Sequence, residues 1–168
     1  MAGTVRLLLR VTGFKNARDV AKVWVHTEGS TWYTDDDAWY VANHDIDPDT
    51  NSLVTYVDGV PSGSEGAPCT GNQTHVLLLV RRHLRSRVAC APLAAVGVFV
   101  LHDKNNDGRA STDWLGMPEE GMTASNGARG GFPVGHPCGG DPCWDEAKMA
   151  VDAATAGCVI IDMPMWYP

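Results

Sequence analysis

Alternating apolar and polar residues recur along the chain and predict β-strands. In TVRLLLRVT, from Thr4 to Thr12, every second residue from Val5 to Val11 is apolar. A strand points successive side chains to opposite faces, so this period of two predicts a strand with one buried face. Similar or continuously apolar runs predict further strands at residues 19–26, 39–41, 53–57, 75–80, 94–101 and 157–163.

Segments without a sustained period separate these strands. We interpret residues 28–74 as a long hairpin or an elaborated insertion within a single domain, residues 1–168. The segment 103–131 has no helical period and is predicted to be a loop, whereas residues 145–154 predict a short helix or a strand edge. Short strands joined by turn-rich loops predict an all-β fold, an antiparallel sandwich or barrel with at most one or two short helices.

The composition indicates a folded, acidic domain. Apolar residues make up 44% of the 168 residues, while 18 glycines and 10 prolines favour turns over long helices. The formal net charge of -7 argues against nucleic acid and anionic membrane surfaces as partners. The sequence contains no apolar run long enough to span a bilayer and no recognisable signal peptide, so we expect any targeting segment to have been removed already.

The stretch DKNNDGR, residues 103–109, is similar to the first half of a calcium-binding loop. Oxygen-bearing groups recur where such loops supply ligands: the side chains of Asp103, Asn105 and Asp107 and the carbonyl of Arg109. Trp114 stands where the loop needs a glutamate, so Asp113, Glu119 or Glu120 would have to complete the shell around Ca²⁺. A tight turn capped by its own Asp and Asn side chains explains the same pattern, and both hypotheses stay open.

Aromatic residues provide candidate contacts with a partner or ligand. They are Trp32, Tyr33, Trp39 and Tyr40 beside an acidic run at residues 35–37, and Trp114 in the later loop. Aromatic side chains with polar neighbours are enriched at protein interfaces and in sites for sugars or pigments. The alternative is a small core that stabilises the insertion.

The common enzyme motifs are missing from this sequence, which contains no nucleophile elbow, zinc-protease helix or nucleotide-binding loop. His44 and His102 are the candidates for a metal-assisted hydrolase, provided that one of them converges with Asp103 and Asp107. His102 is adjacent to Asp103, and a strand would point these two side chains to opposite faces. An enzymatic function is therefore the least favoured class.

The five cysteines predict one disulfide. Cys138 and Cys143 enclose Gly-Gly-Asp-Pro, a turn that can bring two cysteines within bridging distance. Two independent thiols in a reducing compartment are the alternative. A bridge between Cys69 and Cys90 is a weaker candidate, and Cys158 is expected to be buried in an apolar strand.

Several motifs occur in one order: VFVLHDKNNDGR, LGMPEEG at residues 115–121, Ser125-Asn126, and PCWDEAKM. In these motifs, and in the opening TVRLLLRVTGFKNARDVAKVWV, the chain resembles the family called domain of unknown function 2141, mostly secreted or periplasmic bacterial proteins. The resemblance implies a small antiparallel β-sandwich of prealbumin- or immunoglobulin-like kind, acting outside the cytoplasm, with no known reaction. The aromatic insertion and the pair Cys138 and Cys143 depart from the family pattern.

These observations favour a non-catalytic, extracytoplasmic binding or accessory module. We expect it to dock to a protein partner or to a larger membrane-associated assembly, in which it has no transmembrane segment of its own. The alternative is a small-ligand or calcium-binding protein, with a sugar or pigment on the aromatic insertion. A metal-assisted hydrolase is the third hypothesis.

Overall fold

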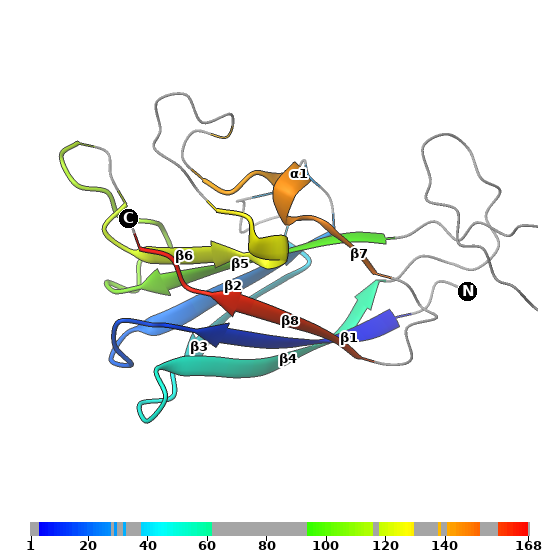
Figure 1. The fold of residues 1–168 in the computed structure, drawn as a ribbon, viewed down its shortest axis with the longest axis horizontal. Helices are drawn as coiled ribbons and strands as arrows, with labels where there is room; N and C mark the ends of the chain where they lie inside the picture. Colours follow the sequence, from blue (N-terminus) through cyan, green and yellow to red (C-terminus); the bar gives the residue numbers. More distant parts are fainter. Residues whose placement is uncertain are drawn as a thin grey trace, which may run out of the picture.

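The computed structural model describes residues 4–27, 29, 32, 38–61, 94–115, 118–129, 138, 141–151 and 158–167, and its strands form a sandwich of two sheets (Figure 1). The predicted all-β class is therefore confirmed. The elements in chain order are β1 (Thr4–Thr12), β2 (Val20–His26), β3 (Tyr40–Asp45), β4 (Ser52–Pro61), β5 (Ala94–Asp103), β6 (Gly121–Ala124), the 3-10 turn η2 (Ser125–Gly127), α1 (Trp144–Ala147), β7 (Met149–Val151) and β8 (Cys158–Pro164).

The two sheets differ in size and direction. One contains three strands in the order β4-β1-β8, and the other has the order β3-β2-β5-β6, with β7 paired to the start of β5. All described strand pairs are antiparallel except β1 with β8, which is parallel. The predicted antiparallel sandwich is therefore confirmed, with one parallel pair among its described strands. The chain reaches β8 from β7, which belongs to the other sheet, so no hairpin forces β8 to run against β1.

The alternating pattern of β1 produces the core between the sheets. Leu7, Leu9 and Val11 are fully buried, whereas the alternate positions Arg6 and Arg10 are exposed and Leu8 is partly exposed. The buried residues pack against the inward residues of β2 and β5, such as Val23 and Val100. Burial of each such side chain contributes roughly 1.5–3 kcal/mol, so this core supplies most of the stability of the sandwich.

A second core covers the opposite face of the larger sheet. Trp24, Phe99 and Leu101 point to this side and pack with Trp32 and with Ala147 of α1. Because β5 is buried on both faces, its sequence AAVGVFVL is continuously apolar rather than alternating. The segment around α1 therefore acts as a lid on the sheet (Figure 1).

The C-terminal segment joins the two sheets along one edge. After β8, Met165 donates its N–H to the carbonyl of Thr12 at 2.8 Å. Trp166 then exchanges two backbone hydrogen bonds of 2.9 Å with Met122 in β6. In Figure 1 the C-terminus accordingly lies beside β6. The chain end is thus part of the sandwich.

Three expectations from the sequence need correction or definition. Residues 121–124, predicted as loop, form the fully buried strand β6, because Met122 and Ala124 fill the second core. Residues 145–154 contain both a short helix and a short strand, α1 and β7. Cys158 is exposed, not buried, because the inward positions of β8 are Ile161 and Met163.

Several predictions concern residues outside the described part of the chain. They are the strand at residues 75–80, a role for Tyr33, and the pairing of Cys69 with Cys90. Within the described residues, no helix has the length and apolar character required to cross a membrane.

Candidate functional site

The β5–β6 connection begins with a turn built around the carboxylate of Asp103. This side chain is buried at the end of β5. Its two oxygens accept the N–H groups of Asp107 at 3.2 Å and Gly108 at 2.8 Å. Gly108 has a φ of +76°, the left-handed conformation that glycine adopts without strain. Asp103 therefore closes the turn in the way an Asp at the first position of a calcium loop does, and also in the way a simple Asx cap does.

The other predicted ligands are bonded to the same turn. Asn105 Oδ1 accepts the N–H of Asp107 at 3.1 Å, and Asn105 Nδ2 donates to Asp107 Oδ2 at 2.8 Å. Asp107 Oδ1 accepts the N–H of Arg109 at 2.8 Å. Further along, Asp113 Oδ1 accepts the N–H of Leu115 at 2.8 Å. The predicted side-chain ligands Asp103, Asn105, Asp107 and Asp113 thus each accept a hydrogen bond within the loop, and calcium binding stays a prediction.

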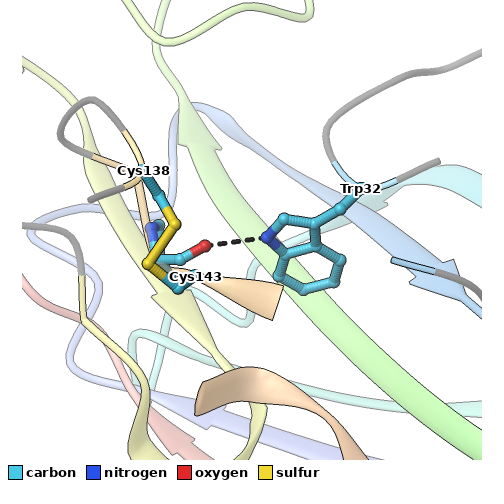
Figure 2. Close-up of a disulfide and its surroundings, with 4 residues drawn as sticks. Trp32, Cys138 and Cys143 are labelled. Atoms are coloured by element: carbon cyan, nitrogen blue, oxygen red, sulfur yellow. Dashed lines mark hydrogen bonds between the residues drawn. A yellow bond between two sulfur atoms is a disulfide. The ribbon is translucent and has the colours of Figure 1, made fainter. Parts of the chain in front are cut away.

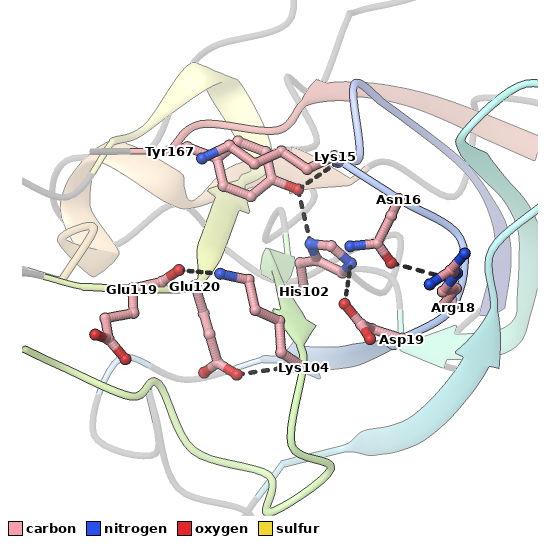
Figure 3. Close-up of polar contacts among 9 residues, drawn as sticks. All are labelled: Lys15, Asn16, Arg18, Asp19, His102, Lys104, Glu119, Glu120 and Tyr167. Atoms are coloured by element: carbon pink, nitrogen blue, oxygen red, sulfur yellow. Dashed lines mark hydrogen bonds and ion pairs between the residues drawn. The ribbon is translucent and has the colours of Figure 1, made fainter.

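The carboxylate of Glu120 joins the start and the middle of this connection by hydrogen bonds. Its side chain is only 1% exposed. Oε1 accepts the backbone N–H of Lys104 at 2.8 Å (Figure 3). Oε2 accepts the backbone N–H of Ser111, also at 2.8 Å. Glu119 adds an antiparallel contact, because its N–H donates to the carbonyl of Ser111 at 2.9 Å. The sequence predicts Glu120 only as a candidate cation ligand. An acidic pair in a predicted loop gives no local signal that one of the two carboxylates is buried.

The turn is also fastened to the larger sheet. Asn106 Oδ1 accepts a hydrogen bond of 3.1 Å from Asn43 Nδ2 on β3. Lys22 of β2, which is almost buried, places Nζ 3.5 Å from the carbonyl oxygen of Gly108 and 4.7 Å from the ring centre of Trp24. These contacts hold the start of the loop against the sheet.

His102 lies at the centre of a buried polar network on the other side of β5. Its Nδ1 is 2.8 Å from the hydroxyl of Tyr167, which accepts the backbone N–H of Lys15 at 2.9 Å (Figure 3). Because that hydroxyl already accepts one hydrogen bond, its own hydrogen can be donated to Nδ1, which leaves Nε2 as the protonated nitrogen. Nε2 is 3.4 Å from Asp19 Oδ2, an electrostatic contact longer than a good hydrogen bond.

Burial controls the protonation of this histidine. The His102 side chain has no exposed surface. Its pKa is lowered from 6.5, first by desolvation and then by the positive charge of Lys104, while Asp19 and Glu120 oppose the shift. The pKa of Tyr167 is raised, chiefly by burial. The network is suited to locking the C-terminal segment against β5 rather than to exchanging protons with solvent.

The two candidate histidines do not converge with the Asp103 turn. His102 and Asp103 point to opposite faces of β5, as expected for neighbours in a strand. His44 Nε2 is 3.1 Å from the hydroxyl of Tyr40, and desolvation lowers the pKa of His44. Among the residues that the structure describes, no three His, Cys, Asp or Glu side chains are grouped to hold a metal ion.

A disulfide organises the lid over the second core. Cys138 and Cys143 are bonded, with their Cα atoms 5.5 Å apart, which confirms the pairing predicted from CGGDPC. Inside this loop the carbonyl of Pro142 accepts a 2.7 Å hydrogen bond from the indole Nε1 of Trp32 (Figure 2). Trp32 is only 7% exposed, so its side chain belongs to the core in this structure. The disulfide therefore positions a carbonyl that holds the aromatic segment in place.

Other aromatic candidates lie at the surface. Trp39 is 38% exposed, and Tyr40 is partly buried beside the core between the sheets. Trp114 is the most exposed large apolar residue described, at 90%, and the neighbouring Leu115 is 58% exposed. Partner contact by these residues stays a prediction.

The outer face of the three-stranded sheet carries a second exposed apolar group. The strand register places Leu8 of β1 between Tyr56 of β4 and Ile160 of β8. Tyr56 and Ile160 are each 55% exposed, and Val54 on the same face is 61% exposed. The sequence did not predict this apolar face, and among the outward positions of β1 only Leu8 could have indicated it.

A family comparison applies to the part of the chain that holds this loop and lid. Residues 85–157 match the model of an uncharacterized protein conserved in bacteria, DUF2141. This match, over less than half of the chain, supports the resemblance to the DUF2141 family. The match includes the Asp103 turn, β6, α1 and the disulfide, but not β1 and β2, which the sequence resemblance also took in. Searches of the curated proteins and of the solved structures gave no match.

Proposed function

We propose that the protein is a non-catalytic, extracytoplasmic accessory module that binds a protein partner or a larger membrane-associated assembly. The partner binds the outer face of the three-stranded sheet. The observation that carries this proposal is the exposed row Tyr56, Leu8 and Ile160, with Val54 beside it. Exposed large apolar side chains gathered on one sheet face are typical of an interaction site.

Charged residues border this apolar row on both sides. On one side of the row, Arg6 forms an ion pair with Asp58. On the other side, Arg10 donates two hydrogen bonds to Asp162, of 2.6 and 2.7 Å. An apolar centre with a polar rim is the usual anatomy of a protein interface, and the rim pairs are already satisfied within the chain. A partner would thus gain affinity chiefly by covering the apolar row.

The disulfide supports the extracytoplasmic part of the proposal. A bridge between Cys138 and Cys143 persists in oxidising compartments and is uncommon in the cytosol. It lies in the lid over the second core, where its reduction would loosen the Trp32 contact.

In-cell crosslinking tests the proposed interface. A photoreactive residue at Val54 should give one defined protein adduct in cells of the native source. The Tyr56→Ser/Ile160→Ser variant should lose that adduct and bind the purified partner at least roughly tenfold more weakly, because two apolar contacts are removed. The matched control is Val41→Ser, which removes an exposed apolar side chain from the other sheet. Equal binding by both variants would refute this interface.

Calcium binding is the second candidate function. The observation that favours it is the Asp103 carboxylate, which already holds the turn through the amides of Asp107 and Gly108. Calorimetric titration of chelator-treated protein with CaCl₂ tests this candidate, with Asp107→Asn as the comparison. Heat that is lost in the variant would support a site, and its absence at millimolar calcium would exclude one in the range of extracellular modules.

A further inference from the structure

The β5–β6 connection ends in an exposed apolar tip. Trp114 has 90% of its surface exposed and Leu115 has 58%, so neither side chain is covered by the rest of the described chain. In Figure 1 this connection projects from the body of the sandwich near the C-terminus. Exposure of these apolar side chains to water is unfavourable in free energy, and contact with an external apolar phase removes this cost.

The base of this tip is held in a defined conformation. Thr112 and Pro118 form an antiparallel bridge beneath it, and Glu120 fixes the amide of Ser111. Asp113 caps the amide of Leu115 at 2.8 Å. The backbone at Trp114 and Leu115 is thus ordered before any contact is made, which lowers the entropy lost on binding.

Charged residues of both signs lie below the uncharged tip. The sequence has no charged residue between Asp113 and Glu119. Below this uncharged stretch, the Lys104 ammonium donates to the carbonyl of Glu119, and the Lys104 and Arg109 side chains are both exposed. The tip is thus uncharged, and the residues below it carry charges of both signs. This order matches the change in polarity across a lipid headgroup layer, where tryptophan side chains are enriched.

We propose that Trp114 and Leu115 insert into the interfacial layer of a zwitterionic lipid bilayer. The shape of the tip favours a bilayer over a protein pocket. Interface hot spots lie near the centre of a broad patch that excludes water, whereas Trp114 projects from a loop whose described neighbours are mainly polar. The net charge of -7 selects neutral over anionic lipid.

This inference goes beyond the proposed function, because it requires no protein partner. Two apolar side chains give weak, reversible attachment, in the same way that a single lipid anchor does. Stable peripheral attachment to a membrane needs two such contributions. The partner-binding face of the three-stranded sheet would supply one, and the tip would supply the other.

Co-sedimentation with sucrose-loaded phosphatidylcholine vesicles tests the proposal with the full chain. We expect the wild type to partition onto the vesicles and Trp114→Ser/Leu115→Ser to partition at least roughly tenfold less. Trp39→Ser, which removes a partly exposed tryptophan elsewhere, should partition like the wild type. Addition of phosphatidylglycerol should reduce binding of the wild type at low salt. Brominated phosphatidylcholine should quench more emission in the wild type than in the tip variant.

Three outcomes would overturn the proposal: no partition of the wild type, equal partition of the tip variant, or stronger binding to the anionic vesicles. Loss of the protein partner by the tip variant, without vesicle binding by the wild type, would identify the tip as a protein contact instead. The vesicles contain no protein, so a failure here leaves the test of the sheet face unaffected. Thermal denaturation of the tip variant should match that of the wild type, because both replaced side chains are exposed.

Discussion

Replacement of Glu120 by glutamine should destabilise the protein well beyond the effect expected for a loop residue. The carboxylate of Glu120 is almost completely buried and accepts the amides of Lys104 and Ser111, each at 2.8 Å. Glutamine keeps one acceptor oxygen, but it places an NH₂ group against the other amide. One charge-assisted hydrogen bond is then lost, and a partly buried backbone N–H is left without an acceptor.

The expected cost follows from these two changes. Hydrogen bonds to charged groups contribute about 1.5–3 kcal/mol, and the unsatisfied amide adds to the loss. We therefore expect Glu120→Gln to lower the free energy of unfolding by about 2–3 kcal/mol. For a protein of this size, this corresponds to a fall in Tm of roughly 4–12 °C. Circular dichroism during thermal and urea denaturation measures both quantities.

Glu119→Gln is the matched control, since it makes the same chemical change at the preceding, exposed residue. The contacts described for Glu119 use its backbone, so its Tm should stay close to that of the wild type. If Glu120→Gln and Glu119→Gln melt at the same temperature, Glu120 does not clasp the loop, and the reasoning about the loop is wrong.

Three further predictions concern the cores. Trp32→Phe should lower the free energy of unfolding by about 2–3 kcal/mol, because it removes the 2.7 Å hydrogen bond to the Pro142 carbonyl and leaves a void. Urea denaturation measures this free energy, and a loss under about 0.5 kcal/mol would contradict the contact. Gly97→Ala should cost about 1–3 kcal/mol by the same assay, because its Cβ would lie 2.6 Å from Trp144 and 2.8 Å from Trp32. An unchanged midpoint would show that the lid can move away. Stability should fall as pH decreases below about 6.5, because the unfolded chain takes up a proton on His102 that burial disfavours in the folded state. Urea midpoints measured from neutral to acid pH should show a weaker dependence in His102→Gln, and identical slopes would refute this assignment.

The strands were predictable where a single face is buried. β1 alternates with a period of two, and its buried residues are the apolar ones from Val5 to Val11. β5 was also predictable, because a continuous apolar run of this length is typical of a strand that is covered on both faces. Periodicity and continuous apolar runs together therefore located the strands that build the core between the sheets.

The remaining elements depend on contacts between distant segments. β6 has only four residues, and its burial follows from the return of Trp166 and from the lid around α1. The parallel direction of β8 likewise depends on how the chain crosses between the sheets. No local pattern encodes such contacts, which explains why residues 121–124 were predicted to be loop.

The sequence predicted the chemical groups of the candidate site better than it predicted what each residue does. The pairing of Cys138 with Cys143 followed from the turn between them. The run of Asp and Asn residues after β5 predicted a turn, and Asp103 and Asp107 do accept its amides. The burial of Trp32 and the exposure of Trp114 could not be separated, because both are tryptophans among polar neighbours. Only the fold decides which of them the lid covers.

Above all, we infer that the Asp103 turn is a scaffold that holds the exposed tip in place. Hydrogen exchange measured by NMR on the amides of Lys104, Gly108 and Ser111 tests it most directly, since each donates to a carboxylate of Asp103 or Glu120. We expect these amides to exchange at least roughly a hundredfold more slowly than in an unstructured peptide, without added calcium. Exchange at the rate of an unstructured peptide, slowed only when calcium is added, would show that the loop is a metal site rather than a scaffold.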